Sequence, residues 1–183
     1  IALLGRKNIN QPYELYLLGE FPYETYDSQP MYCLEKSDCV VFSEHTFAMA
    51  LSKDWPTFFA MLQRIRYHNG EVGVASRNHY TEADWDKNNS WLVQDITTEL
   101  KGATPADFTQ KIDRKKFLKN RYKIDREIPV EVLHDKFIPW NQVAAIESQL
   151  QEGDFVNVMR GNKAENAYAG HVGLIVKGDD GKI

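Results

Sequence analysis

The hydrophobic positions form helical patterns early in the chain and strand patterns near its end. Val40–Leu51 is apolar on nearly all sides, which predicts a buried helix. Pro56–Arg66 has one apolar face at helical spacing and a proline near its start, which predicts a second helix. Phe155–Arg160 and His171–Lys177 indicate two strands. Helices followed by strands predict an α+β domain with an antiparallel sheet.

Shorter patterns fill the rest of the chain. Gln11–Leu18 predicts a short helix, and Thr81-Glu82-Ala83-Asp84 has the spacing of a capping box that would open another. Trp91–Thr97 alternates like a strand. Ile128–Leu133 predicts a further strand and Asn141–Leu150 a further helix.

Composition and charge exclude several classes of protein. The 183 residues suit a single domain, and no apolar run approaches the ~20 residues of a membrane helix. Lys and Arg number 22 against 26 Asp and Glu, a net charge of −4, so we expect no nucleic-acid partner. The basic segment Lys111–Arg126 contains interleaved acids, which favours a solvated face.

The C-terminal residues predict an unfinished hairpin. Gly178-Asp179-Asp180-Gly181 is typical of a turn, and Lys182-Ile183 would start the returning strand. We therefore expect a single catalytic domain over 1–183 that lacks part of its C-terminal region.

Cys39 is the first candidate for chemistry. Asp38 can cap the helix predicted over Val40–Leu51, which places Cys39 in the first turn. The positive end of the helix dipole favours the nucleophilic thiolate, and the unpaired N–H groups there can hold an oxyanion. The alternative is a small buried cysteine that fills space. Cys33 lies six residues earlier, and we expect it to be free, because a disulfide would disable a nucleophilic Cys39.

His171 is the second candidate. Strand alternation puts His171 and Gly173 on one face and Val172 and Leu174 on the other. Gly173 leaves space beside the histidine, whereas a lone strand histidine is otherwise structural. A cysteine on an early helix and a histidine on a late strand follow the order in which papain-like enzymes supply nucleophile and base.

Four motifs in this order resemble the NlpC-type cell-wall hydrolases. Those enzymes carry a Gly-x-Pro-Tyr-like segment, an Asp-Cys nucleophile, a Gly-Asp turn into a strand, and a His-Val-Gly strand. The first motif is looser here, because two residues separate Gly19 from Pro22. The matching segments are Leu17-Leu18-Gly19-Glu20-Phe21-Pro22-Tyr23, Ser37-Asp38-Cys39, Gln151-Glu152-Gly153-Asp154-Phe155 and His171-Val172-Gly173.

The middle of the chain resembles one branch of that superfamily, the N-acetylmuramoyl-L-alanine amidase-like branch formerly catalogued as a domain of unknown function. The matching segments are Ile65-Arg66-Tyr67-His68-Asn69-Gly70, Arg77-Asn78-His79-Tyr80, Asp84-Trp85 and Asp95-Ile96-Thr97. The resemblance implies a papain-like, NlpC-type fold with N-terminal helices packed on a C-terminal antiparallel sheet.

The resemblance also implies roles for individual residues. Cys39 matches the nucleophile, His171 the general base, and Tyr23 the tyrosine whose hydroxyl lines the nucleophile pocket. The residue that orients the histidine sits on the following strand in the family, which we expect beyond Ile183. The implied reaction cleaves the amide between the muramic lactyl group and L-alanine in muropeptides, with a preference for anhydro-muramic fragments. No metal or cofactor is implied, and the expected location is the bacterial cell envelope, periplasmic or secreted.

A loop supplies candidate substrate-binding residues: Arg77, His79, Tyr80 and Trp85. Aromatic faces suit a sugar ring and an arginine fork suits a peptide carboxylate, although an ordinary packed surface loop explains the same residues. Arg66 is a candidate for a structural pair with an acid such as Asp95. His45, His68 and His134 have no metal-ligand spacing.

Two other functions stay open. The same thiol chemistry could serve an endopeptidase that cuts between D-glutamate and the diamino acid, although the middle motifs favour the amidase. A non-catalytic glycan-binding module could keep the fold, but the presence of both Cys39 and His171 argues against it.

Overall fold

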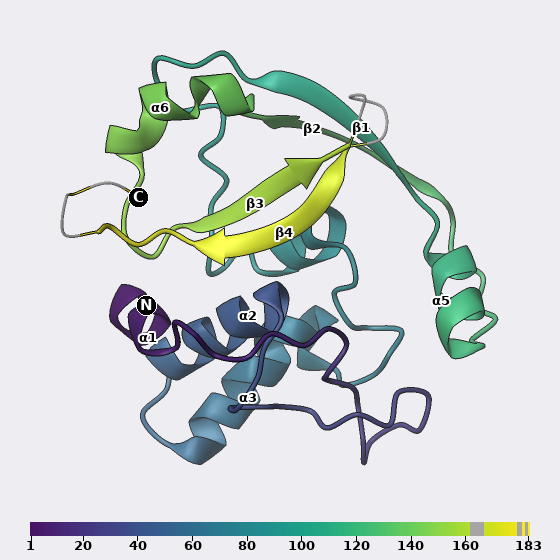
Figure 1. Ribbon diagram of the computed structural model, residues 1–183. Helices are drawn as coiled ribbons and strands as arrows, with labels where there is room; N and C mark the ends of the chain where they lie inside the picture. The colour runs from purple at the N-terminus through teal and green to yellow at the C-terminus, as the bar shows by residue number, and fades with distance from the viewer. Residues whose placement is uncertain (162–166, 179–180, 182) are drawn as a thin grey trace.

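The computed structural model describes residues 1–161, 167–178, 181 and 183 (Figure 1). Three helices, α1 (Ala2–Lys7), α2 (Cys39–Ala50) and α3 (Trp55–Arg66), form a layer at the bottom of the view. The antiparallel hairpin of β3 (Phe155–Arg160) and β4 (Tyr168–Leu174) lies over that layer.

A second antiparallel hairpin arches above the first and consists of β1 (Ala106–Ile112) and β2 (Glu131–Phe137), with α5 (Arg114–Tyr122) at its far end (Figure 1). Within the described residues the strands form two separate two-stranded sheets. The remaining elements are short: η1 (His68–Gly70), η2 (Thr81–Trp85), α4 (Asp86–Asn88), η3 (Trp140–Gln142), α6 (Val143–Ile146) and η4 (Glu147–Gln149).

Side-chain caps define where the two long helices begin. The Asp38 carboxylate accepts a hydrogen bond from the Val41 N–H at 2.8 Å, which confirms the predicted cap and makes Cys39 the first residue of α2. Asp54 and Thr57 form a capping box at the start of α3. Each cap satisfies N–H groups that the helix itself leaves unpaired, a contribution of ~1 kcal/mol.

The main core joins α2, α3 and the β3–β4 hairpin. Its buried cluster contains Phe47, Ala48, Phe58, Leu62, Ile65 and Trp85. Phe155 of β3 and Leu174 of β4 pack against that cluster. Because both strands contribute to the same core as α2, the hairpin is held over the helix that carries Cys39.

The β3–β4 hairpin contains an irregularity next to His171. Val158 pairs with His171 and Met159 with Ala169, so Gly170 is an extra residue in β4. A Cβ at Gly170 would lie 2.4 Å from the Arg160 Cδ, so a side chain here would force Arg160 to move. Bulges of this kind redirect neighbouring side chains and increase local twist.

Several expected elements differ from the observed ones. Residues 11–18 are not helical. Main-chain hydrogen bonds from Ser37 N to the Pro12 carbonyl and from Glu14 N to the Ser37 carbonyl hold residues 12–14 extended beside residue 37, and residues 15–16 form a turn. Residues 91–97 are turns and irregular segments rather than a strand. Residues 141–150 break into short helical turns, and the strand expected over 128–133 begins later, at Glu131.

The α+β architecture, with helices early and antiparallel strands late, is confirmed, but the sheet is divided into two hairpins. The papain-like assignment stays a prediction. Among the described residues, no helix is both long and apolar enough to span a membrane. The predicted turn at residues 178–181 and the returning strand fall partly on residues 179, 180 and 182, outside the described residues.

Candidate active site

Cys39 is a partly exposed free thiol at the first position of α2. The Asp38 carboxylate, which could oppose a thiolate, is engaged by the Val41 N–H. Helix geometry leaves the N–H groups of Cys39 and Val40 outside the intrahelical ladder, at the positive end of the dipole. This end of α2 therefore combines a nucleophile with donors suited to an oxyanion.

Tyr13 lies beside Cys39, a neighbour that the sequence did not single out. A parallel bridge between Tyr13 and Ser37 brings the tyrosine to the residues just before α2. Burial raises the pKa of the Tyr13 hydroxyl, and its side-chain contact with Cys39 raises that pKa further. The hydroxyl therefore keeps its proton at neutral pH and is available as a donor next to the thiol.

His171 lies on β4, which packs against α2. Its side chain is exposed, whereas Val172 is 2 % exposed, as strand alternation predicts. A Cβ built on Gly173 meets no atom within 4 Å, so the space beside the histidine is open. The direct pairing of the Cys39 sulfur with the His171 ring stays a prediction.

An open cleft of about 240 Å³ begins at the N-terminus of α2. The two neighbours of Cys39 in the sequence, Asp38 and Val40, line one end of it. The other lining residues include Arg77 and His79 from the predicted substrate loop, Arg121 and Tyr122 from α5, and Tyr16 and Leu18 from the N-terminal segment. Cys39 and His171 themselves do not line the cleft, which reaches the start of α2 through Asp38 and Val40.

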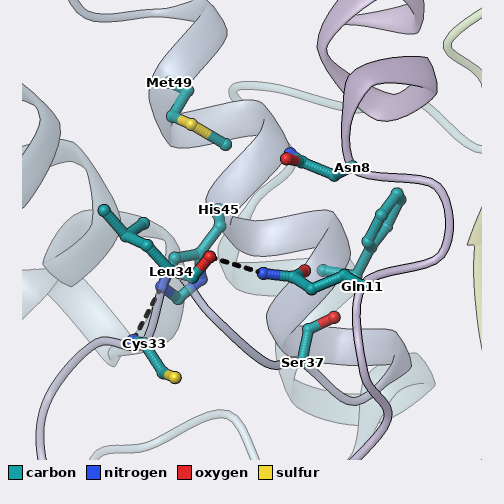
Figure 2. A pocket seen from close by; sticks show the side chains of 8 residues that line it. Asn8, Gln11, Cys33, Leu34, Ser37, His45 and Met49 are labelled. Atoms are coloured by element: carbon teal, nitrogen blue, oxygen red, sulfur yellow. Dashed lines mark hydrogen bonds between the residues drawn. The ribbon is translucent and has the colours of Figure 1, made fainter.

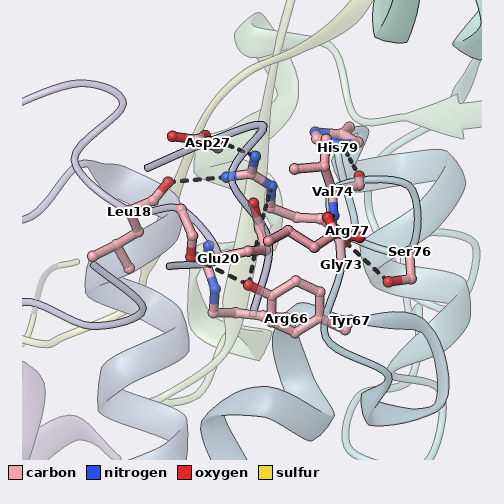
Figure 3. A network of polar contacts seen from close by, with 12 residues as sticks. Leu18, Glu20, Asp27, Arg66, Tyr67, Gly73, Val74, Ser76, Arg77 and His79 are labelled. Carbon is pink, nitrogen blue, oxygen red and sulfur yellow. Dashed lines mark hydrogen bonds and ion pairs between the residues drawn. The ribbon is translucent and has the colours of Figure 1, made fainter. Parts of the chain in front are cut away.

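Arg77 lines the cleft, but its guanidinium is already occupied by protein groups (Figure 3). It donates to the Leu18 carbonyl and the Asp27 carboxylate, each at 2.9 Å, and lies 3.1 Å from the Glu20 carboxylate. Glu20 is fully buried, and burial raises its pKa. These contacts make Arg77 the centre of a structural network that ties the N-terminal segment to residues 67–79.

His79 and Tyr80 are also held by packing. The His79 ring donates from Nε2 to the Val74 carbonyl at 2.7 Å and lies against Phe117. Burial lowers the pKa of His79 to about 3, so the ring is neutral. The Tyr80 ring contacts Phe117 and the Arg114 guanidinium of α5. Of this pair, only His79 lines the cleft.

Trp85 does not fit the role of a sugar platform. It is 1 % exposed and stacks on Phe155 at 4.5 Å between ring centroids. Its Nε1 donates to Glu44, which also accepts from Arg66 at 3.0 Å. Arg66 therefore has a structural carboxylate partner, as expected, but this partner is Glu44 and not Asp95.

Tyr23 is exposed, and its role in lining the nucleophile pocket stays a prediction. Tyr13 is the tyrosine whose hydroxyl interacts with Cys39. No local sequence signal predicts that Tyr13 lies near Cys39, because this proximity depends on the bridge from Tyr13 to Ser37.

Cys33 is a free thiol, as expected, and lines a separate pocket of about 120 Å³ (Figure 2). Its N–H donates to His45 Nε2 at 3.4 Å, while His45 Nδ1 donates to the Val41 carbonyl at 2.8 Å. Burial lowers the pKa of His45 to about 4, so this imidazole is neutral. Within the described part of the chain, His, Cys, Asp and Glu form no group of three or more suited to a metal ion.

Residues 3–183 match the family described as AmiA-like, N-acetylmuramoyl-L-alanine amidase-like. The match covers nearly the whole chain, and the protein belongs to this family.

Solved structures support the fold. A Legionella pneumophila protein from a family of unknown function has 22% identity and a TM-score of 0.81, covering 98% of this chain and 74% of that one. An N-acetylmuramoyl-L-alanine amidase from Bacteroides uniformis has 21% identity and a TM-score of 0.74, covering 99% and 82%. A Bacteroides fragilis protein described as a candidate xylanase has 19% identity and a TM-score of 0.69, covering 98% and 83%. No curated protein matches the chain.

Proposed function

We propose that this protein is a cysteine-dependent N-acetylmuramoyl-L-alanine amidase that acts on peptidoglycan fragments. One observation carries the proposal: Cys39 is a free, partly exposed thiol at the first position of α2, and the strand that carries His171, β4, packs on that helix. Leu174 packs into the core shared with α2, and the exposed His171 side chain lies on the other face of β4. Family membership supports the choice of the bond that is cleaved, because the family is described as N-acetylmuramoyl-L-alanine amidase-like.

The proposed reaction is acyl transfer. His171 accepts the thiol proton of Cys39, and the thiolate attacks the lactyl carbonyl to form a tetrahedral intermediate. Collapse of the intermediate breaks the C–N bond, and His171 passes its proton to the leaving amine of L-alanine. Water, deprotonated by His171, then hydrolyses the thioester and returns the thiol. The reaction consumes one water and needs no oxidant or reductant.

Tyr13 takes the place proposed from sequence for Tyr23. Its raised pKa keeps the hydroxyl protonated, and its interaction with Cys39 supports a role as a donor to the negative charge that develops during attack. Together with the first N–H groups of α2 it would stabilise the oxyanion, and removal of one such donor typically costs ~3 kcal/mol. Arg77, His79 and Tyr80 then support the cleft, and Trp85 is left out of the proposed site.

The proposed substrates are soluble muropeptides, with the preference for anhydro-muramic fragments resting on the sequence resemblance. A location in the bacterial cell envelope, periplasmic or secreted, follows from that substrate. The family's link to peptidoglycan supports both points.

Mass spectrometry of digested muropeptides tests the proposal. We expect the wild type to release free stem peptides that begin with L-alanine, and Cys39→Ala to release none. Cys33→Ala is the matched control, because it removes the other thiol, and should keep wild-type turnover. Cleavage after D-glutamate would instead identify an endopeptidase, and binding without any cleavage would identify a glycan-binding module. Full turnover by Cys39→Ala would overturn the thiol mechanism.

A further inference from the structure

The three arginines that line the cleft differ in their partners. Arg66 pairs with Glu44, and Arg77 pairs with Glu20 and Asp27. Arg121 is exposed and forms no ion pair within the described residues; its Nε donates to the Tyr122 hydroxyl at 3.0 Å, which leaves both Nη groups free. Arg121 is therefore the cleft cation that is available to an incoming anion.

Tyr16 positions this arginine. The Arg121 guanidinium carbon lies 4.0 Å from the centroid of the Tyr16 ring, a cation–π contact that orients the planar fork. Tyr16 has a φ of 60°, in the left-handed region that disfavours residues with a Cβ. Its ring is 66% exposed, so burial of the side chain does not explain this backbone conformation.

One short segment connects this pair to the nucleophile. Tyr13 contacts Cys39, and three residues later Tyr16 lies under Arg121. Leu17 and Leu18, which follow directly, also line the cleft. A substrate that reacts at Cys39 and extends into the cleft would therefore pass along this segment toward Arg121.

We propose that Arg121, oriented by Tyr16, binds a carboxylate on the stem peptide of the substrate. This inference rests on the proposed function. The lactyl carboxyl of muramic acid is consumed in the scissile amide, so a muramoyl-dipeptide carries its carboxylates on the peptide side alone. A guanidinium matches a carboxylate through two parallel hydrogen bonds, which also explains why an oriented fork suits the task.

The other basic residues that line the cleft are poorly placed to bind a substrate carboxylate. An anion at Arg77 would have to displace Asp27, and an anion at Arg66 would have to displace the buried Glu44. His79 is neutral and donates to a backbone carbonyl. Recognition of a carboxylate in this cleft thus falls to Arg121.

The test compares substrates as well as variants. Three muramoyl-L-alanyl-D-glutamate derivatives are used: the diacid, the α-amide and the γ-amide. Hydrolysis is followed with wild type, Arg121→Gln, Arg121→Lys and Tyr16→Ala. Arg126→Gln is the control, since Arg126 is another exposed arginine and lies outside the cleft lining. Melting temperatures exclude unfolding as a cause.

We expect Arg121→Gln to raise KM for the diacid about tenfold while kcat changes less than twofold. Arg121→Lys should recover part of the loss, and Arg126→Gln should match the wild type. One of the two amides should bind poorly to the wild type and show no further loss with Arg121→Gln; the identity of that amide names the carboxylate. An equal effect of Arg121→Gln on all three substrates, or no effect on any, overturns the inference.

A separate readout distinguishes this failure from failure of the proposed function. If the wild type cuts none of the three compounds, the amidase proposal fails. The inference is then judged by calorimetric binding of the same compounds to the wild type and to Arg121→Gln. Selective loss of diacid binding supports it, and equal binding or no binding overturns it.

Discussion

Two groups of polar side chains in and around the cleft differ in how completely the protein buries them. Around Arg77 and Tyr67, buried groups satisfy one another: the Tyr67 hydroxyl donates to Glu20 at 2.9 Å, and Arg77 engages two carboxylates (Figure 3). At Cys39, His171 and Arg121 the reactive or charged atoms face solvent or open space. Polar side chains buried against protein partners support a fold, whereas those left accessible are the candidates for chemistry.

The largest expected effect comes from disrupting the buried group around Arg77. Arg77→Ala removes the cation beside the fully buried Glu20 and the partly buried Asp27. Loss of one partner of a buried pair is strongly destabilising, and we expect ~2–4 kcal/mol from chemical denaturation. Any loss of turnover should follow the loss of folded protein. Full stability with a direct loss in kcat would instead return Arg77 to the substrate site.

The pH dependence of that loss sharpens the same comparison. Burial raises the folded-state pKa of Glu20 above its unfolded value, so the stability linked to the protonated form is complete below the unfolded pKa. This stability is lost as pH rises through the folded pKa. Without Arg77 the folded pKa rises further, so Arg77→Ala should be more destabilising at pH 8 than at pH 4. The same destabilisation at both values would mean that Glu20 does not titrate with folding.

A smaller effect on turnover is expected from the accessible tyrosines, Tyr13 and Tyr23. Tyr13→Phe removes the hydroxyl beside Cys39 and should lower kcat for muropeptide hydrolysis by about tenfold or more. Tyr23→Phe removes an exposed hydroxyl and is the matched control, with turnover unchanged. A loss in Tyr23→Phe with none in Tyr13→Phe would support the sequence-based assignment over the structural one.

Local signals predicted the elements that depend on neighbours in sequence. Asp38 before an apolar run indicated both the start of α2 and the position of Cys39, and Phe155–Arg160 agrees with the observed β3. The strand β1 was missed because its sequence, with Thr109, Gln110 and Lys111, is polar and forms a strand through pairing with β2. Such pairing is a long-range contact that local propensity does not encode.

In the candidate site, too, the features that depend on long-range contacts were not predicted from the sequence. The exposed tyrosine at Cys39 and the partner of Arg66 both depend on contacts between distant segments. Trp85 had the chemistry of a sugar platform, but its place in the core was set by Phe47 and Phe155, which reach it from α2 and β3. An aromatic side chain has the same appearance in sequence whether it packs in a core or faces a ligand.

The central claim is that Cys39 is an activated thiol, and comparative alkylation tests it most directly. Lys36 lies between Cys33 and Cys39, so trypsin places the two cysteines in separate peptides after brief treatment with iodoacetamide. The account predicts that Cys39 is alkylated at least about tenfold faster than Cys33 at pH 7, because a nucleophile served by a general base reacts faster than an ordinary thiol. Equal rates, or faster reaction at Cys33, would contradict the account.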